Sequence, residues 1–253
     1  MQWEDEAVVI AARPQGESSL VLQLLTSRRG RHAGLARGAR RAKGRGAYEI
    51  GSRVTAHWQA RLPEHLGLLR CELVQSCAAL LIDDAPRLAC LAAAAAVAEA
   101  ALPEREAVPR SYAGLLAALD ALCTDRLWAR RYVEWELTLL AELGFGLDLS
   151  QCAATGAREE LAFVSPRSAQ AVSRGAGEPW RDRLLPLPAF LCDAGEPASL
   201  AAIGDGLRLT GFFLERHVFA PLGHAPPSAR ARFVDRMARA ATISGAETLP
   251  IDD

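Results

Sequence analysis

Residues 32–59 read HAGLARGARRAKGRGAYEIGSRVTAHWQ, and the change of residue composition within this stretch decides the predicted fold of the N-terminal part. Short apolar runs occur at both ends, His32–Ala36 and Val54–Gln59, and such runs beside turn-forming residues are typical of β-strands. The segment between them, Arg37–Gly51, is too polar and too rich in glycine for a regular core element. We therefore expect two strands joined by an exposed loop or a short irregular turn.

Three further apolar runs flank this stretch, at Ala7–Ala12, Ser19–Thr26 and Leu66–Leu73. Five strands in about 75 residues predict a small barrel of OB type, whose curved face and loops bind oligonucleotides. An SH3-like barrel is the alternative, because sequence alone separates these two architectures poorly.

From about Gln75 onward the apolar residues recur at helical spacing. Helices are predicted at 86–102, 109–123, 126–143, 199–217 and 227–241. In the third of these, one face carries the stripe Trp128, Tyr132, Trp135, Leu139 and Leu143, which we expect to be buried. Several prolines limit element length between residues 147 and 197.

The predicted fold is thus a multidomain α+β protein. An OB-type barrel over residues 1–78 is followed by an all-α domain over residues 79–245. Residues 147–197 form an irregular insertion in that domain, and residues 246–253 are expected to be a disordered tail.

Charge is distributed unevenly along the chain, although the formal net charge is only -1. Residues 1–80 contain 12 Lys/Arg against 7 Asp/Glu, a net charge of +5, so the remainder is net acidic. Guanidinium groups on a glycine-containing loop can approach and grip phosphates. The candidate DNA-binding residues are Arg37, Arg40, Arg41, Lys43 and Arg45, with Arg28, Arg29 and Arg31 in support. The plain alternative is a solvated loop that keeps the protein soluble.

Two other features have structural interpretations that we favour over functional ones. Trp58 could stack on a base, as aromatic residues do in single-strand binders, but a core position is the better prediction. A second basic cluster on the last helix is expected to be a solvated face; it consists of Arg230, Arg232, Arg236 and Arg239.

No catalytic constellation meets a spacing rule, so we predict a protein that is not an enzyme. The segment Gly38–Lys43 lacks the second glycine and the hydroxyl residue of a phosphate-binding loop. The 5 histidines are dispersed, and the 6 cysteines contain no C-x-x-C pair. The cysteines are expected to be reduced and mostly buried.

Neither a membrane span nor a secretory signal is predicted. The longest apolar stretch, Leu88–Leu102, is mostly alanine and contains Glu99, which indicates a buried helix. The acidic opening at Glu4–Glu6 differs from the basic start of a signal peptide. We expect a cytoplasmic protein.

Several segments, in order along the chain, resemble the RecO family of DNA repair and recombination mediators. Gly16-Glu17-Ser18 with Leu25-Thr26 and Gly30 resembles its opening hairpin, and Gly38–Lys43 resembles its basic Gly-Ala-Arg-Arg-Pro-Lys signature, with Ala42 in place of proline. The strongest similarity is in Glu136–Leu149, followed by Cys152 and then Phe163–Ser168. The resemblance extends from about residue 5 to residue 240.

Many relatives bind zinc through two C-x-x-C pairs after the Leu-Asp-Leu motif. The corresponding positions here are Cys152, Thr155, Ser173 and Ala176. A single thiolate cannot supply the four N or S ligands of structural zinc, so we expect neither a metal nor another cofactor. Packing of Phe163, Val164 and Val172 against the helical core is one hypothesis for what replaces the metal.

The resemblance implies binding of single- and double-stranded DNA and annealing of complementary strands at the nucleoid. It also implies action with RecR in the RecF pathway to load RecA onto strands coated with single-stranded-DNA-binding protein. Arg130 and Arg131 are candidates for contacting the tail of that coating protein, with an intrahelical salt bridge as their more ordinary role. A protein-interaction adaptor and an RNA-binding barrel protein are the alternatives.

Overall fold

The computed structural model describes residues 1–41, 45–62, 64–193, 195–196 and 198–246. The chain divides into two compact units. The barrel unit comprises Met1–Trp128 and Pro227–Arg230, and the helical unit comprises Ala129–Pro226 and Ala231–Asp253.

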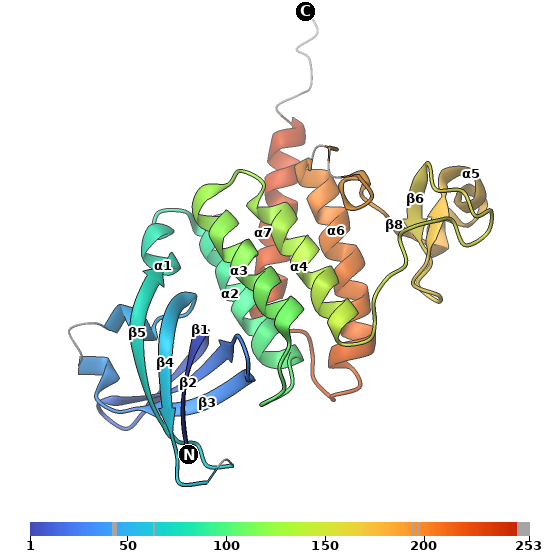
Figure 1. Ribbon diagram of the computed structural model, residues 1–253. Helices are drawn as coiled ribbons and strands as arrows, with labels where there is room; N and C mark the ends of the chain where they lie inside the picture. The colour runs from blue at the N-terminus through green and yellow to red at the C-terminus, as the bar shows by residue number, and fades with distance from the viewer. Residues whose placement is uncertain (42–44, 63, 194, 197, 247–253) are drawn as a thin grey trace, which may run out of the picture. The chain divides into compact units, whose positions relative to one another are not determined.

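Five strands, coloured blue to cyan in Figure 1, close into a barrel in the order β1-β2-β3-β5-β4. Their bounds are β1 (Gln2–Gln15), β2 (Ser19–Thr26), β3 (Gly30–Ala36), β4 (Ser52–Gln59) and β5 (Leu68–Ser76). Neighbouring strands are antiparallel except β3 and β5, which meet in parallel through Leu35 and Leu68. This closure confirms the prediction of an OB-type barrel.

Strand β1 begins at Gln2, well before the predicted start at Ala7. Its first half pairs with β4 and its second half with β2, and a β-bulge near the middle lets the strand curve between the two partners. Burial alternates from Trp3 through Asp5 to Ala7. A search for apolar runs misses this alternation, because one of the inward positions is a carboxylate.

Trp58 belongs to the barrel core, as its favoured interpretation predicted. It is 2% exposed, and its ring stacks on Trp3 with 5.5 Å between centroids. Its Nε1 donates to the carbonyl oxygens of Ala33 and Leu66, both at 3.1 Å. With its ring buried and its polar atom engaged inside the protein, Trp58 is not a platform for base stacking.

Three helices complete the barrel unit: α1 (Cys77–Leu80), α2 (Ala85–Ala101) and α3 (Pro109–Thr124). Helix α2 begins where the side chain of Asp84 accepts a hydrogen bond from the backbone nitrogen of Arg87. Its alanine-rich surface allows close packing, and α2 contacts β1. Gly51 is part of this fit, because a Cβ there would lie 2.5 Å from the side chain of Leu91. The predicted buried helix is confirmed.

The helical unit is built on α4 (Trp128–Glu142), α6 (Leu200–Phe213) with its π-helical continuation η5 (Leu214–Phe219), and α7 (Ser228–Ala246). The centre of the predicted aromatic stripe on α4, Tyr132, Trp135 and Leu139, is fully buried. A buried carboxylate joins α4 to α6: Glu136 accepts hydrogen bonds from the Tyr132 hydroxyl at 2.6 Å and the Thr210 hydroxyl at 2.5 Å.

Residues 147–197, predicted to be irregular, contain a small sheet of order β7-β6-β8, drawn in yellow in Figure 1. Its elements are β6 (Leu161–Val164), β7 (Ala171–Ser173), α5 (Arg174–Gly177), η3 (Glu178–Arg183) and β8 (Leu185–Pro186), with η4 (Ala189–Leu191) following. The strands have 4, 3 and 2 residues, too short for a period of two to show in the sequence. Phe163 lies against Gly177, where a Cβ would approach its ring to 2.4 Å.

Two expectations concern the ends and boundaries of these parts. The tail predicted at 246–253 lies, apart from Ala246, outside the described residues. The division into domains at residue 78 stays a prediction.

None of the helices in the described part of the chain combines the length and the hydropathy needed to cross a membrane.

Candidate nucleic-acid interface

The basic segment between β3 and β4 is anchored to the barrel at several points. It contains two short 3-10 turns, η1 (Ala39–Arg41) and η2 (Arg45–Tyr48), and Ala39 and Ala47 are buried in the barrel core. The backbone nitrogen of Arg40 donates to the carbonyl of Ser18 at 3.0 Å, and the Ser52 hydroxyl donates to the carbonyl of Gly46 at 2.6 Å. Ala39 and Ala47 therefore hold the loop, while the described side chains of Arg40 and Arg41 are exposed.

Three of the five arginines and lysines predicted on this loop have described side chains, and all three are exposed: Arg37, Arg40 and Arg41. Arg40 donates to the carbonyls of Gly16 and Glu17 in the β1–β2 turn. Arg41 lies 3.5 Å from the Glu17 carboxylate, but both groups are exposed, and such pairs contribute only about 0–1 kcal/mol. Lys43 and the side chain of Arg45 lie outside the described residues.

Arg37 borders a hollow at the seam where β3 and β5 meet. This hollow has a volume of about 280 Å³ and is also lined by Tyr48, Leu68 and Arg70. Arg70 was not among the predicted site residues. Its signal in the sequence is the strand alternation, which turns Arg70 outward between the buried Leu69 and Cys71.

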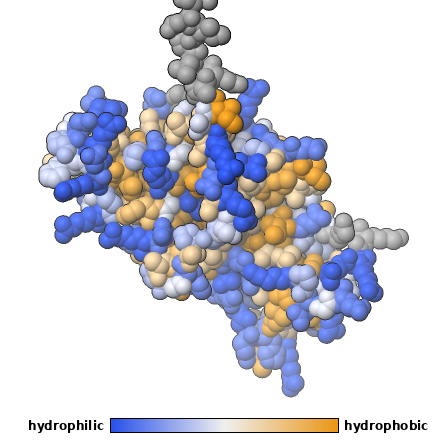
Figure 2. All heavy atoms as spheres, turned by 180° about the vertical axis from the view of Figure 1, so that it is seen from behind, coloured by the Kyte–Doolittle hydropathy of each residue, from blue (hydrophilic) through white to orange (hydrophobic). Residues whose placement is uncertain are grey.

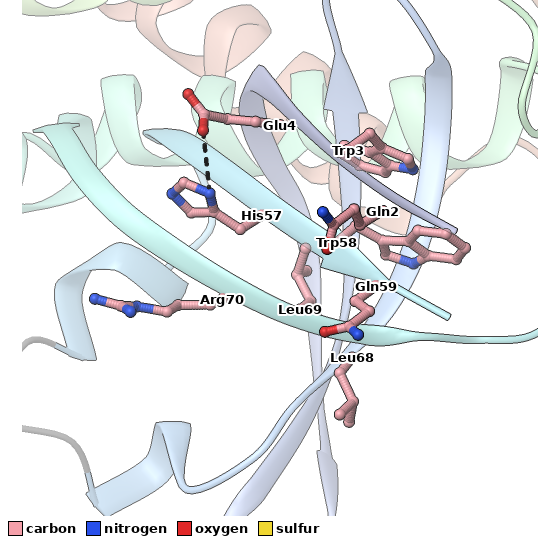
Figure 3. A pocket seen from close by; sticks show the side chains of 9 residues that line it. All are labelled: Gln2, Trp3, Glu4, His57, Trp58, Gln59, Leu68, Leu69 and Arg70. Atoms are coloured by element: carbon pink, nitrogen blue, oxygen red, sulfur yellow. Dashed lines mark ion pairs between the residues drawn. The ribbon is translucent and has the colours of Figure 1, made fainter. Parts of the chain in front are cut away.

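A larger hollow of about 600 Å³ adjoins this seam and shares Leu68 and Arg70 with it. Figure 3 shows that its side chains come from β1, β4 and β5, and that His57 points toward Glu4. The His57–Glu4 distance is 3.4 Å. Arg70 pairs with Glu72 at 3.3 Å, so the surface beyond the loop is mixed in charge and Arg37 is the positive group of the smaller hollow that has no ion pair among the described residues.

Exposed leucines lie in the connection from β4 to β5 and at the first residue of β5. Leu62, Leu66 and Leu68 are all among the exposed large hydrophobic residues, and Leu66 and Leu68 line a third hollow, of about 770 Å³. In Figure 2, hydrophobic side chains lie among hydrophilic ones at the lower end of the molecule. Apolar groups of this kind can contact unpaired bases, whereas the arginines can contact phosphates.

The other predicted arginines lie at the β2–β3 turn, near the start of β1 instead of its end. Arg28 pairs with Asp5, whereas Arg40 contacts Gly16 beyond the far end of the same strand. Ten residues of extended strand separate the two regions by up to about 30 Å. Among the described residues of this predicted set, Arg28 and Arg29 therefore do not share a patch with Arg40 and Arg41.

Arg31 is tied into the protein. Its Nε donates to the Leu102 carbonyl at 2.9 Å and its guanidinium pairs with Glu104 at 3.1 Å. These contacts join β3 to the connection between α2 and α3. Because they occupy much of the Arg31 guanidinium, few of its N–H donors remain to contact a phosphate.

Asp5 fixes the β2–β3 turn from inside the barrel wall. Its buried carboxylate accepts hydrogen bonds from the Ser27 hydroxyl at 2.6 Å and from the backbone nitrogen and Nε of Arg28, both at 3.1 Å. Burial opposes ionisation, but these bonds and the Arg28 charge outweigh it and hold the pKa of Asp5 below its usual 3.8.

Asp5→Asn is expected to lower the free energy of unfolding at pH 7 by about 2–3 kcal/mol, because charge-assisted hydrogen bonds are lost. The stabilisation from a lowered carboxyl pKa is complete above the unfolded-state value of 3.8 and disappears as pH falls through the lower folded-state value. Urea unfolding should therefore show the difference between variant and wild type shrinking below pH 4 or so. Glu17→Gln, at an exposed carboxylate, is the matched control and should change stability little at either pH.

Helix α4 carries the two arginines that were predicted to contact a partner protein, and these two differ in exposure. Arg130 is 7% exposed; its Nε pairs with Glu134 at 2.7 Å and its guanidinium donates to the carbonyls of Phe190 and Glu196. Arg131 is exposed and also pairs with Glu134, at 2.9 Å. The intrahelical salt bridge is therefore present, and Arg130 mainly joins α4 to the segment before α6.

The four arginines of the predicted basic face on the last helix also differ in exposure. Arg230 is buried, whereas Arg232, Arg236 and Arg239 are exposed on α7. The expectation of a solvated face thus applies to three of these four residues.

Two of the positions that the family resemblance matches to zinc ligands, Thr155 and Ser173, lie beside the thiol of Cys152. The backbone nitrogen of Ser173 donates to Sγ of the buried Cys152 at 3.2 Å. Burial raises the pKa of this thiol, but hydrogen bonds from Ser173, Thr155 and Ala154 outweigh that effect and lower the pKa to about 6. In the described part of the chain, no three or more His, Cys, Asp or Glu side chains group together in a way that could hold a metal ion.

Comparison with known proteins covers both units. The family described as "Recombination protein O N terminal" matches residues 1–77, and the one described as "Recombination protein O C terminal" matches residues 82–226. The DNA repair protein RecO of Rhodospirillum rubrum is 52% identical over 245 residues, which cover 94% of this chain and 97% of that protein.

Two further relatives carry the same name. The DNA repair protein RecO of Rhodospirillum centenum is 52% identical over 254 residues, covering 99% of this chain and all of that protein. The DNA repair protein RecO of Caulobacter vibrioides strain NA1000 is 45% identical over 240 residues, covering 95% of this chain and 99% of that protein. Because these similarities extend through the barrel and the helices alike, the chain belongs to the RecO family.

Proposed function

We propose that this protein is a non-enzymatic recombination mediator that binds single- and double-stranded DNA through the loop between β3 and β4 and anneals complementary strands. The observation that carries the proposal is the exposure of Arg37, Arg40 and Arg41 on a loop anchored beside the hollow at the β3–β5 seam. Membership of a family whose relatives are named DNA repair proteins supports the choice of DNA as the ligand.

Annealing requires no bond chemistry. Two polyanions must be brought together, so phosphates must be neutralised while the base edges stay free to pair. Exposed guanidinium groups on an anchored loop can neutralise the phosphates. The exposed leucines near Leu68 offer contacts to unpaired bases without hydrogen-bonding to their edges.

The proposed role extends to loading RecA onto strands coated with single-stranded-DNA-binding protein, with RecR as a partner, on nucleoid DNA in the cytoplasm. The acidic, apolar tail of the coating protein needs basic residues beside an apolar surface. Arg131 suits that role better than Arg130, whose guanidinium is buried among backbone carbonyls.

The test is fluorescence-monitored annealing of complementary oligonucleotides coated with single-stranded-DNA-binding protein. Wild type is expected to accelerate annealing, and a variant with Arg37, Arg40, Arg41, Lys43 and Arg45 all changed to Ala is expected to lose most of that acceleration. Because Arg40 also contacts the β1–β2 turn, the variant's unfolding curve must match the wild-type curve for the result to count.

Failure of the wild-type protein to accelerate annealing would contradict the proposal and favour an adaptor that binds acidic proteins. If a correctly folded variant annealed as well as wild type, the activity would stand but the loop would not be its site. Competition by unrelated single-stranded DNA and RNA oligonucleotides separates the DNA, RNA and adaptor interpretations.

A further inference from the structure

Another cavity, distinct from the three hollows described above, lies in the barrel unit beside the β2–β3 turn, away from the loop proposed to bind DNA. It has a volume of about 250 Å³. The side chains that line it include Trp3, Arg28, Arg29, His32, Trp58 and Arg105. It is therefore bordered by aromatic rings, a histidine and three guanidinium groups.

His32 is the buried polar group of this cavity. It is 8% exposed and meets Trp3 and Trp58 edge to face, with centroid distances of 5.0 and 5.1 Å. Neither Nδ1 nor Nε2 has a hydrogen-bond partner in the described part of the chain. Leaving buried polar atoms without partners is costly, so a group inside the cavity is expected to bond to this ring.

Two of the bordering guanidinium groups lack a neutralising carboxylate among the described residues. Arg29 lies over the Trp3 ring at 5.4 Å, and its buried Nε has no partner. Arg105 donates to the backbone carbonyl of Glu64 at 3.1 Å. Arg28, by contrast, is paired with Asp5.

The conformation of Arg105 is itself held by the protein. Its φ of 60° lies in the left-handed region, which non-glycine residues rarely adopt, and its backbone nitrogen donates to the Arg31 carbonyl at 2.8 Å. Arg31 is in turn fixed to Leu102. The side chain of Arg105 is thus presented to the cavity from a braced connection between α2 and α3.

Burial, together with the charges around the cavity, lowers the pKa of His32 and keeps the ring neutral. Burial, followed by the nearby charges of Arg105 and Arg29, lowers the pKa of His32 to about 4, although Glu104 opposes this. At neutral pH the ring therefore offers one N–H donor to a ligand while the two arginines supply the positive charge.

We propose that this cavity binds a phosphate group, with Arg29 and Arg105 pairing with its oxygens and the His32 ring donating a hydrogen bond to it. Guanidinium groups match phosphate oxygens in geometry and in charge, and a phosphate satisfies the buried ring nitrogen. The phosphate can be inorganic or the terminal group of a DNA strand. The inference does not rest on DNA binding by the β3–β4 loop.

The test is a nuclear magnetic resonance titration that follows the His32 ring, assigned by comparison with His32→Gln. The probes are inorganic phosphate and a short oligonucleotide with either a 5′-phosphate or a 5′-hydroxyl. Phosphate is expected to shift the His32 signals saturably. Arg29→Gln and Arg105→Gln should each weaken this binding about tenfold or more, which corresponds to one lost charge-assisted hydrogen bond.

Arg61→Gln is the matched control, because it removes the same charge from the β4–β5 connection without lining this cavity. It should bind phosphate as wild type does. A stronger shift by the 5′-phosphorylated than by the 5′-hydroxyl oligonucleotide would identify a strand end as the source, and a shift by inorganic phosphate alone would identify the free anion.

No shift of His32 with any probe would overturn the proposal and leave a buried water as the partner of the ring. An equal shift in Arg29→Gln, Arg105→Gln and wild type would overturn it as well. Neither result depends on annealing, so failure here is distinguishable from failure of the proposed mediator function.

Discussion

Gly30→Ala is expected to lower the free energy of unfolding by about 3–5 kcal/mol, a large part of the total stability of a typical domain. Gly30 starts β3 with φ 64°, where a side chain costs about 1–2 kcal/mol. A Cβ there would lie 1.7 Å from the backbone carbonyl oxygen of Glu106, and no change of rotamer can move a backbone atom away.

Relief of this clash must separate β3 from the connection between α2 and α3. That movement would break the hydrogen bond from Arg31 Nε to Leu102 and the one from the Arg105 nitrogen to Arg31, each contributing about 1 kcal/mol. Urea unfolding followed by circular dichroism measures the loss.

Gly16→Ala separates the two causes. Gly16 has nearly the same φ, 62°, but a Cβ there meets no atom within 4 Å. Gly16→Ala should therefore lower the free energy of unfolding by only about 1–2 kcal/mol, the cost of a side chain at positive φ. Equal losses in the two variants would mean that the close approach to Glu106 carries no energy.

The regular elements of this chain could be predicted where local pattern and burial agree. Strand β2 has the predicted bounds Ser19–Thr26, α2 is shifted from its predicted range by one residue at each end, and α3 ends one residue later than predicted. The short strands β6–β8 could not be predicted, because strands of two to four residues are too short to show a period of two in the sequence.

The candidate site was only partly predictable for a similar reason. Exposure of Arg37 follows from its polar, glycine-rich surroundings, whereas the burial of Arg130 depends on the carbonyl of Phe190, sixty residues away in the sequence. Arg31 is engaged by Leu102 in the same long-range manner. A charge run in the sequence therefore identifies basic residues but does not separate those that face solvent from those that brace the fold.

Changing Arg37, Arg40 and Arg41 together to Gln is expected to weaken single-stranded DNA binding about 50-fold at 0.15 M salt. Each phosphate contact releases counterions and adds about 0.7 to the slope of log K against log salt for a single strand. Losing three contacts should lower the magnitude of that slope by about 2, so the two proteins should bind almost equally near 1 M salt. Fluorescence anisotropy over a salt series measures both quantities.

The matched control removes three charges from exposed positions in the helical unit, as Arg232, Arg236 and Arg239 all changed to Gln. Because both variants lose the same net charge, a general electrostatic attraction would weaken binding equally in the two. A local site on the β3–β4 loop predicts that the control keeps nearly the wild-type slope. If the control lost as much slope as the loop variant, DNA would be bound over a diffuse positive surface, and the loop would have no special role.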